Sequence, residues 1–260
     1  IQYIDKNVEN YFYLFELSAQ EDGLVIKYID KDVENYQYLC ELAIKNNGFA
    51  IQYIDKNVEN YSYLCGLAVK QNGFSIKHVS RHIPNYLEIC ELAVQNDGEA
   101  IKYINKELPN YLEICELAVL NYGLAIQYIN EELPNYSYLC ELAVKRDGLA
   151  IQYIDQENVE NYSKICTLAV KQDGLALEYI NKNIPNYLEI CELAVQQNGW
   201  AIKYIDKDIP NYSYLYELAQ QNIVQEEIQI PKWMEEQEYN LWMTDLEQIK
   251  IPTKYSLELS

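Results

Sequence analysis

The sequence predicts an all-α protein, an α-solenoid of tandem 25-residue helix-turn-helix repeats with a C-terminal cap, and three observations lead to this fold class. An Asn-Tyr pair recurs in steps of 25 residues, with one step of 26. In the first eight copies a Gly stands thirteen residues after the Asn, and apolar residues between them follow a helical spacing. A repeat of this length is typical of helical solenoids. Position 1 of each repeat is its Asn: Asn10, Asn35, Asn60, Asn85, Asn110, Asn135, Asn161, Asn186 and Asn211.

The first element of each repeat is expected to be a helix of roughly 12 residues, about 18 Å long. In the fourth copy Tyr86, Ile89, Cys90 and Ala93 lie on one broad helical face. The Asn is expected to cap the helix, and the Gly to end it in a left-handed conformation. Three copies also carry a Glu three residues after the Asn, which predicts a capping box. These pairs are Asn85 and Glu88, Asn110 and Glu113, and Asn186 and Glu189.

The second element follows the Gly and is short, as in LAIQYI at 149–154. A short helix is favoured because Ala150, Ile151 and Ile154 then share one face. The Ile and Tyr content also suits a strand. In that alternative the unit would be a leucine-rich repeat, with this stretch as its strand. The sequence speaks against this alternative, because its residues do not match the L-x-x-L-x-L-x-x-N pattern of leucine-rich repeats at the required positions.

The repeats are expected to cover residues 1–220, as eight full units with partial ends, and a non-repeat cap or tail is expected at 221–260. A solenoid needs an end cap over its last apolar face. Trp233, Met234, Leu241, Trp242 and Leu246, on one helix near 232–248, are the predicted cover; a partner-docking tail is the alternative. The chain starts at Ile1 inside a repeat, so we interpret it as part of a longer protein whose open N-terminal end can self-associate.

The charge excludes two classes of partner. The chain carries 40 acidic and 20 basic residues, for a formal net charge of -20. Nucleic acids bind cationic surfaces, and an anionic membrane surface repels an acidic protein, so neither is an expected partner. No apolar run approaches the roughly 20 residues of a membrane span.

All seven cysteines fall at position 6 of their repeats, from Cys40 to Cys191. Neighbouring helices in a solenoid lie about 8–10 Å apart, which is too far for a disulfide. We therefore expect buried structural thiols and a reducing compartment, the cytoplasm.

The tyrosines at positions 2 and 19 are likewise expected to pack in the core. The glutamates at position 7 predict a solvated face, with an acidic track for basic partners as the alternative.

No catalytic, cofactor-binding or metal-binding residues are assigned, and no cofactor is expected. His78 and His82 have a spacing that can hold a metal on a helix, but no third ligand recurs beside them. No nucleophile, base and orienting group can be assembled either, so the chain is not expected to be an enzyme.

The variable residues at positions 3 and 4 give the candidate partner-binding site. Some repeats carry Leu-Glu there, while the first three carry a Tyr at position 4: Tyr13, Tyr38 and Tyr63. Tyrosine is enriched at protein interfaces, so these three residues predict a partner surface near one end of the array. The alternative is that they only cover neighbouring repeats.

The repeat resembles a known family in a motif seen in three segments: AVKQNG at 68–73, AVKRDG at 143–148 and AVKQDG at 169–174. With the apolar-x-Tyr that follows, they resemble a short helical repeat of unknown function, found in tandem in proteins of giant DNA viruses and of intracellular bacterial pathogens. The resemblance covers about residues 1–220 and implies a helical array with no catalytic residues to transfer. The expected function is a non-catalytic protein-binding scaffold acting in a host cell. The alternatives are a self-assembling or virion-associated component, or the recognition part of a longer enzyme or effector.

Overall fold

A computed structural model describes residues 10–229, with side chains described as far as Ile223. Within this range every element is helical, as the sequence predicts: each of α1–α8 is followed by a six-residue 3₁₀-helix (η), and a further short one, η7, lies in the loop before α7. The α-helices are α1 (Tyr11–Glu21), α2 (Tyr36–Asn46), α3 (Tyr61–Gln71), α4 (Tyr86–Asn96), α5 (Tyr111–Asn121), α6 (Tyr136–Arg146), α7 (Tyr162–Gln172), α8 (Tyr187–Gln197) and α9 (Tyr212–Gln229). The 3₁₀-helices are η1 (Gly23–Tyr28), η2 (Gly48–Tyr53), η3 (Gly73–His78), η4 (Gly98–Tyr103), η5 (Gly123–Tyr128), η6 (Gly148–Tyr153), η7 (Gln156–Asn158), η8 (Gly174–Tyr179) and η9 (Gly199–Tyr204).

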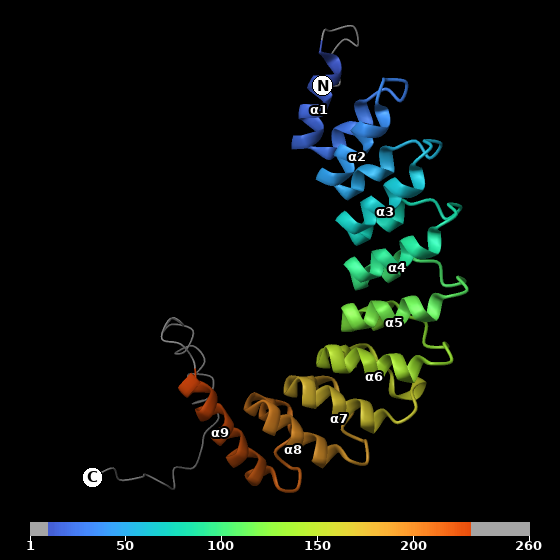
Figure 1. Cartoon of the computed structure of the whole chain (residues 1–260). Coiled ribbons are helices and arrows are strands. Elements are labelled where there is room, and N and C mark those ends of the chain that lie inside the picture. Colours follow the sequence, from blue (N-terminus) through green and yellow to red (C-terminus); the bar gives the residue numbers. More distant parts are fainter. Residues whose placement is uncertain (1–9, 230–260) are drawn as a thin grey trace.

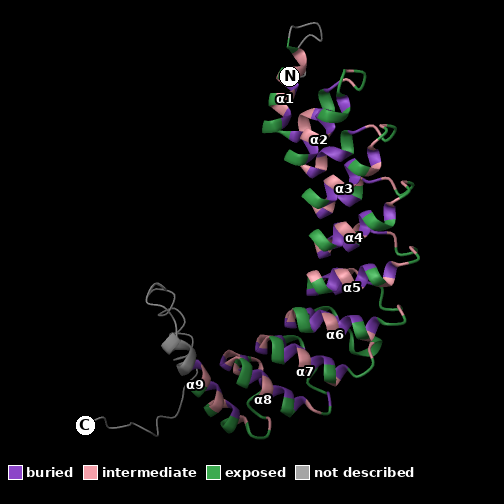
Figure 2. Cartoon of the chain, viewed as in Figure 1, coloured by how far each residue is buried: buried purple, intermediate pink, exposed green. Residues whose placement is uncertain are grey.

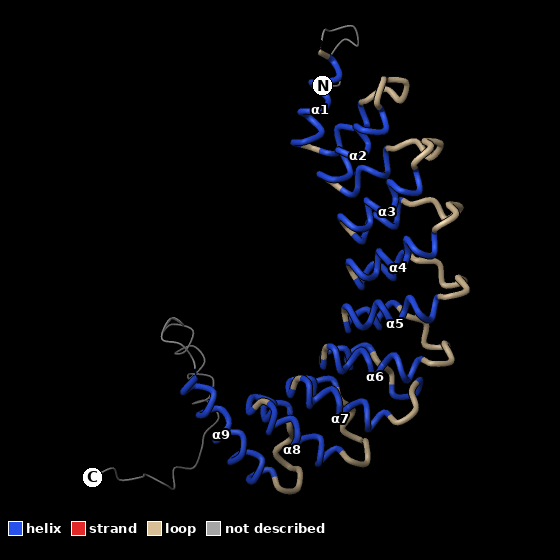
Figure 3. The backbone as a smooth tube through the Cα atoms, viewed as in Figure 1, coloured by secondary structure: helices blue, strands red, loops and turns tan. Residues whose placement is uncertain are grey.

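The repeats stack one after another into an arc (Figure 1). Each α-helix begins at a loop on the outer side of the arc and ends on its inner side (Figures 1 and 3). There the chain turns and enters the 3₁₀-helix, which leads back to the next outer loop. We call the turns between α- and 3₁₀-helices the inner rim and the loops before the α-helices the outer rim.

The core is one continuous layer of apolar side chains, present in every repeat and flanked by exposed residues at both rims (Figure 2). In the α-helices it consists of positions 2, 5, 6, 9 and 10, for example Ile114, Cys115 and Ala118. The short element contributes Ala150, Ile151 and Ile154, the three residues expected to share a face. This element is a 3₁₀-helix, so the strand alternative is wrong.

The recurring Gly does not end the α-helix in a left-handed conformation, as the sequence suggested. None of the described glycines has a positive φ. The residue before the Gly is extended, with φ −154° and ψ 114° at Asn72, and the Gly is the first residue of the 3₁₀-helix. Glycine is required there by space: a Cβ on Gly73 would lie 2.6 Å from the carbonyl oxygen of Ala93 in the next repeat.

The predicted capping boxes are also wrong. Asn85, Asn110 and Asn186 make no side-chain cap hydrogen bond. Their φ values are near −103° and their ψ values near 25°, whereas a capping side chain needs an extended residue. The residue before the Gly is extended, and its side chain caps the 3₁₀-helix instead: Asn72 Oδ1 accepts a hydrogen bond from Phe74 N at 3.0 Å.

Side-chain amides at position 12 join neighbouring repeats along the inner rim. Asn96 Oδ1 accepts a hydrogen bond from Gly73 N at 3.0 Å, and Asn96 Nδ2 donates to the carbonyl of Lys70 at 2.8 Å. Asn46 bridges α1 and α2 in the same way. An amide carries both a donor and an acceptor, so one side chain satisfies two backbone groups of the preceding repeat.

At the C-terminal end, α9 runs past the boundary predicted at residue 220 and reaches Gln229. Ile223 is buried and packs beside Gly199 of η9. The predicted cover at Trp233, Met234, Leu241, Trp242 and Leu246 lies outside the described residues. Among residues 10–229, no helix combines the length and the apolar content that crossing a membrane requires.

Candidate interaction surfaces

The three tyrosines of the predicted partner site lie on the first turns of α1, α2 and α3. Tyr13, Tyr38 and Tyr63 are 55%, 45% and 56% exposed. Leu39 and Leu64, beside Tyr38 and Tyr63, are fully buried, whereas Leu14 beside Tyr13 is only half-buried. Tyr138 and Tyr214 occupy the same position and are each 50% exposed, so exposure here belongs to the repeat and not to one end of the array.

Position 4 of one repeat faces position 7 of the repeat before it. Tyr38 donates a hydrogen bond to Glu16 at 2.6 Å, and Lys164 pairs with Glu141 at 2.6 Å. Tyr214 donates to Glu192 at 3.0 Å. The glutamates at position 7 are therefore not a uniformly solvated row, because several are half-buried and bound by the next repeat.

The tyrosines at position 19 meet the expectation of core packing only in part: Tyr103, Tyr128 and Tyr204 are half-buried and pack against the core, whereas the other four in the described residues are exposed. Tyr28 and Tyr179 are 43% and 42% exposed. A 3₁₀-helix has three residues per turn, so Ile51 and Ile54 at positions 17 and 20 face inward and Tyr53 at position 19 does not. These rings instead hold lysines: Lys102 Nζ lies 5.2 Å from the Tyr103 ring and 5.4 Å from the Tyr128 ring.

The position-2 tyrosines and the cysteines are buried as expected. Seven of these tyrosines, Tyr36 to Tyr187, are buried, and all seven cysteines are buried free thiols. Burial raises the pKa of the Cys115 thiol to about 12, and burial together with the neighbouring Cys115 raises the pKa of Tyr111. The thiols are therefore neutral and have no means to act as nucleophiles at ordinary pH.

The two histidines do not form a common site. His78 is in η3, where its ring meets Phe49 edge-on at 6.1 Å, and burial lowers its pKa. His82 lies in the following outer loop, where its backbone N–H bonds Ser80. No group of three His, Cys, Asp or Glu side chains in the described part of the chain is arranged to hold a metal ion.

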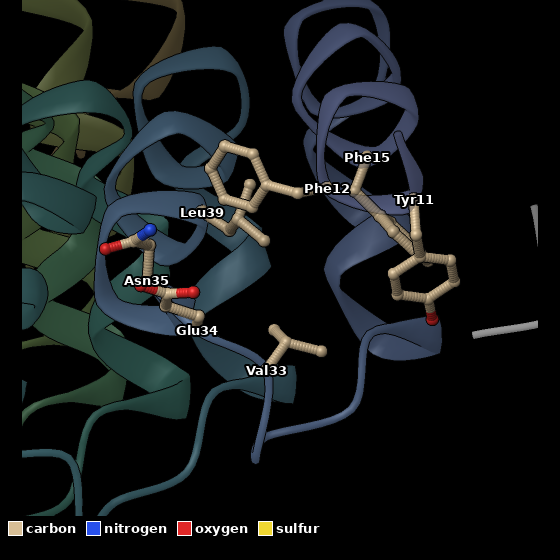
Figure 4. Close-up of a pocket in the computed structure, with 7 residues that line it drawn as sticks. All are labelled: Tyr11, Phe12, Phe15, Val33, Glu34, Asn35 and Leu39. Atoms are coloured by element: carbon tan, nitrogen blue, oxygen red, sulfur yellow. The ribbon is translucent and has the colours of Figure 1, made fainter. Parts of the chain in front are cut away.

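A cavity of about 420 Å³ opens between α1 and α2 at the N-terminal end of the described array (Figure 4). Figure 4 shows Phe12 reaching toward Leu39 from α1, while the Tyr11 ring points away from α2. Phe15 of α1 adds to the lining, and the outer loop before α2 contributes Val33 and Glu34.

Sequence reasoning missed one set of exposed residues. Leu120 and Tyr122 are 53% and 37% exposed, and both lie on the inner rim where α5 ends. Arg146, at the end of α6, donates from Nε to the carbonyl of Asn121 at 3.2 Å. The signal that was present in the sequence is their departure from the repeat: other copies carry Lys or Gln at position 11 and, before the 3₁₀-helix, Asn or Asp at position 13.

Comparison with known families agrees with the repeat architecture. The profile of a domain of unknown function (DUF4116) matches four stretches of the chain, of which the first three overlap: residues 64–109, 86–134, 111–158 and 163–209. Together they cover more than half of the 260 residues. No curated protein and no solved structure matches the chain. With its stacked helix pairs and these tandem matches, the chain belongs to the DUF4116 family, whose function is unknown.

Proposed function

We propose that this chain is a non-catalytic scaffold that binds a protein partner in a host cell through the exposed tyrosines of α1–α3. The observation that carries the proposal is the recurrence of Tyr13, Tyr38 and Tyr63 on consecutive helices, each about half exposed. A Tyr side chain offers a rigid ring and a hydroxyl at a low entropic cost, which suits an interface anchor. The host-cell setting is proposed from the resemblance of the repeat motif.

The test is affinity capture from a eukaryotic host lysate at two salt concentrations, with a Tyr13→Ser, Tyr38→Ser, Tyr63→Ser variant beside the wild type. A matched control variant carries Tyr28→Ser, Tyr53→Ser and Tyr179→Ser, which removes three rings of similar exposure from the 3₁₀-helices. We expect the first variant to lose a discrete partner that the control retains. Equal capture by all three proteins would refute the proposed surface.

The alternative function, self-assembly through the N-terminal end, is favoured by the cavity between α1 and α2. Phe12 and Phe15 line this cavity, and apolar surface of this kind is a common interface between copies. Sedimentation velocity over a range of concentrations separates the two functions. A mass that grows with concentration, and that Phe12→Ser abolishes, would favour assembly, whereas a stable monomer favours the binding scaffold.

A further inference from the structure

Three residues depart from the repeat at one point of the inner rim. Position 11 is Lys or Gln in the eight other α-helices but Leu120 in α5. Position 13, the residue between an α-helix and its 3₁₀-helix, is Tyr122 before η5 and is Asn or Asp in the other seven repeats that have such a turn. Position 12 is Asn or Gln in α2–α5 and α7–α9 but Arg146 in α6, and Arg146 contacts Asn121, which stands between Leu120 and Tyr122.

Two of these departures remove contacts that other repeats have. Tyr122 leaves η5 without a side-chain cap, whereas the residue before η4 or η6 accepts the capping hydrogen bond. Arg146 has no acceptor atom, so it lacks the hydrogen bond by which Asn96 holds Gly73 N–H. Arg146 keeps only the donor half of the bridge, through its bond to the Asn121 carbonyl, and residues that break a local structural rule are expected at functional sites.

The three side chains have the chemistry of an interface. Leu120 is the most exposed leucine of the described residues, and Tyr122, two residues on at the same end of α5, is 37% exposed. Arg146 is exposed, and apart from the bond from Nε its guanidinium has no carboxylate partner in the described range. Tyrosine and arginine dominate the binding energy of protein interfaces, and a guanidinium binds a carboxylate with two parallel hydrogen bonds.

The carboxylates near Tyr122 already have partners within the chain. Glu99 pairs with Lys102 and accepts a hydrogen bond from Tyr128, while Asp97 and Asp147 cap η4 and η6. Arg146 and its exposed neighbour Lys145 are thus left without anions. Elsewhere the α-helices present ten glutamates and a single lysine at positions 4 and 7. An acidic segment is repelled by that face; at this point of the rim it finds two adjacent cations, whereas the exposed lysines at position 11 of other repeats, Lys45, Lys70 and Lys171, are followed by Asn or Gln.

We propose that Leu120, Tyr122 and Arg146 form a second interaction site, separate from Tyr13, Tyr38 and Tyr63. Its ligand is an extended segment of a partner protein in which an apolar side chain stands next to a carboxylate. The apolar side chain packs on Leu120 and the Tyr122 ring, and the carboxylate binds the Arg146 guanidinium. This site goes beyond the proposed scaffold function, because neither site requires the other.

The test uses a variant that restores the repeat: Leu120→Gln, Tyr122→Asp and Arg146→Asn. A phage-displayed random peptide library is selected on the full chain and counter-selected on this variant, and enriched peptides are measured by fluorescence anisotropy. We expect peptides with Asp or Glu beside Leu, Phe or Trp, and binding about tenfold weaker to the restored variant and to Arg146→Gln. The Tyr13, Tyr38, Tyr63→Ser variant should bind them as the wild type does.

Stability separates a binding role from a structural one. The restored variant regains a cap and an amide bridge, so its Tm should rise by about 2 °C while its binding falls. A lower Tm would mean that the three residues serve the fold, and would overturn the proposal. The proposal would also be overturned if no peptides were enriched, or if the enriched peptides lacked carboxylates. A third contrary result would be a wild-type dimer in sedimentation velocity that is absent only from the restored variant, because the three residues would then form a contact between copies.

Discussion

The inner rim and the outer part of each repeat are held by different kinds of contact. At the inner rim the residue that ends the α-helix has nearly the same backbone in eight repeats, with φ between −139° and −154°. At the outer rim the Asn of position 1 takes two conformations: φ is 62° at Asn35 and −102° at Asn85. The inner turn is fixed by backbone packing against the next repeat, whereas the outer loops contact one another through exposed side chains, such as Lys31 with Asp55.

Most of the buried polar atoms without a partner among the described residues lie in the outer part; the exception is Ser75 Oγ in η3, next to Gly48. At the inner rim the amide of Asn96 and the backbone groups it bridges all have partners. In the outer part, Asn110 Oδ1 and the Tyr111 hydroxyl are buried without a partner among the described residues, as are Asn186 Oδ1 and the Tyr187 hydroxyl. We infer that the inner rim sets the spacing of the array and that the outer part tolerates variation, and four predictions test this difference.

Alkaline pH should have the largest effect, and it acts on the buried thiols in the middle of the α-helices, between the two rims. The Cys115 thiol has an ordinary pKa of 9.0 and a folded pKa raised to about 12 by burial. Between these values the unfolded chain has lost a proton that the folded chain keeps, so the free energy of unfolding falls as pH rises through this window and is unaffected below it. We expect a loss of about 1 kcal/mol per thiol near pH 10, measured by urea unfolding at a series of pH values.

The matched variant is Cys90→Ala with Cys115→Ala. Each substitution lowers stability at neutral pH through a small cavity, but the variant should lose about 2 kcal/mol less than the wild type between neutral and alkaline pH. An identical pH dependence in both proteins would show that the buried thiols do not govern alkaline unfolding.

Gly73→Ala should have the next largest effect, because it acts on the close approach at the inner rim. Its Cβ would lie 2.6 Å from the Ala93 carbonyl oxygen and 2.8 Å from Asp97 Cβ, so two repeats must move apart. We expect a loss of about 3 kcal/mol in the free energy of unfolding, measured by urea denaturation. The control is Gly66→Ala within α3, where the nearest atom is Ile89 Cδ1 at 3.3 Å, and we expect a gain of about 0.5 kcal/mol there.

Asn96→Leu should cost about 2 kcal/mol, because it removes both hydrogen bonds of one amide bridge and leaves Gly73 N–H without its acceptor. Asn96→Gln should cost less than about 0.5 kcal/mol, since Gln71 makes the equivalent bond to Gly48 N at 2.8 Å. Thermal unfolding of the two variants measures the difference. Equal losses would mean that the bridge contributes through side-chain size and not through its hydrogen bonds.

The period and the helical spacing predicted the fold because they follow from which residues must be buried. Cys115 and Tyr111 are in the core where the spacing placed them. The details of the turns were not predictable in the same way. The sequence motif Asn-Gly suggests a left-handed cap as readily as a crowded turn, and only the neighbouring Ala93 carbonyl shows that Gly73 serves the second purpose. Contacts between repeats are therefore what single-repeat reasoning lacks.

The two candidate sites also differ in whether the sequence alone could predict them. Exposure of Tyr13, Tyr38 and Tyr63 could be predicted from their place beside the helical core stripe. The site at Leu120, Tyr122 and Arg146 could not, because its evidence is the loss of a cap and of an amide bridge whose existence only the structure reveals. Once those contacts are known, the same three departures can be recognised in the sequence.

The smallest effect is expected at the outer rim, from deletion of Asn158, the extra residue of the 26-residue step. Asn158 ends η7, and its side chain hydrogen-bonds the Glu131 carboxylate in the preceding loop, a contact between exposed groups. Such contacts are worth little in water, and shortening a loop by one residue changes its closure entropy only slightly. We expect a change below about 0.5 kcal/mol by urea denaturation. Deletion of Asp173, which caps η8 at the inner rim, is the matched change and should prevent that repeat from packing. Comparable losses from the two deletions would contradict the distinction between the rims.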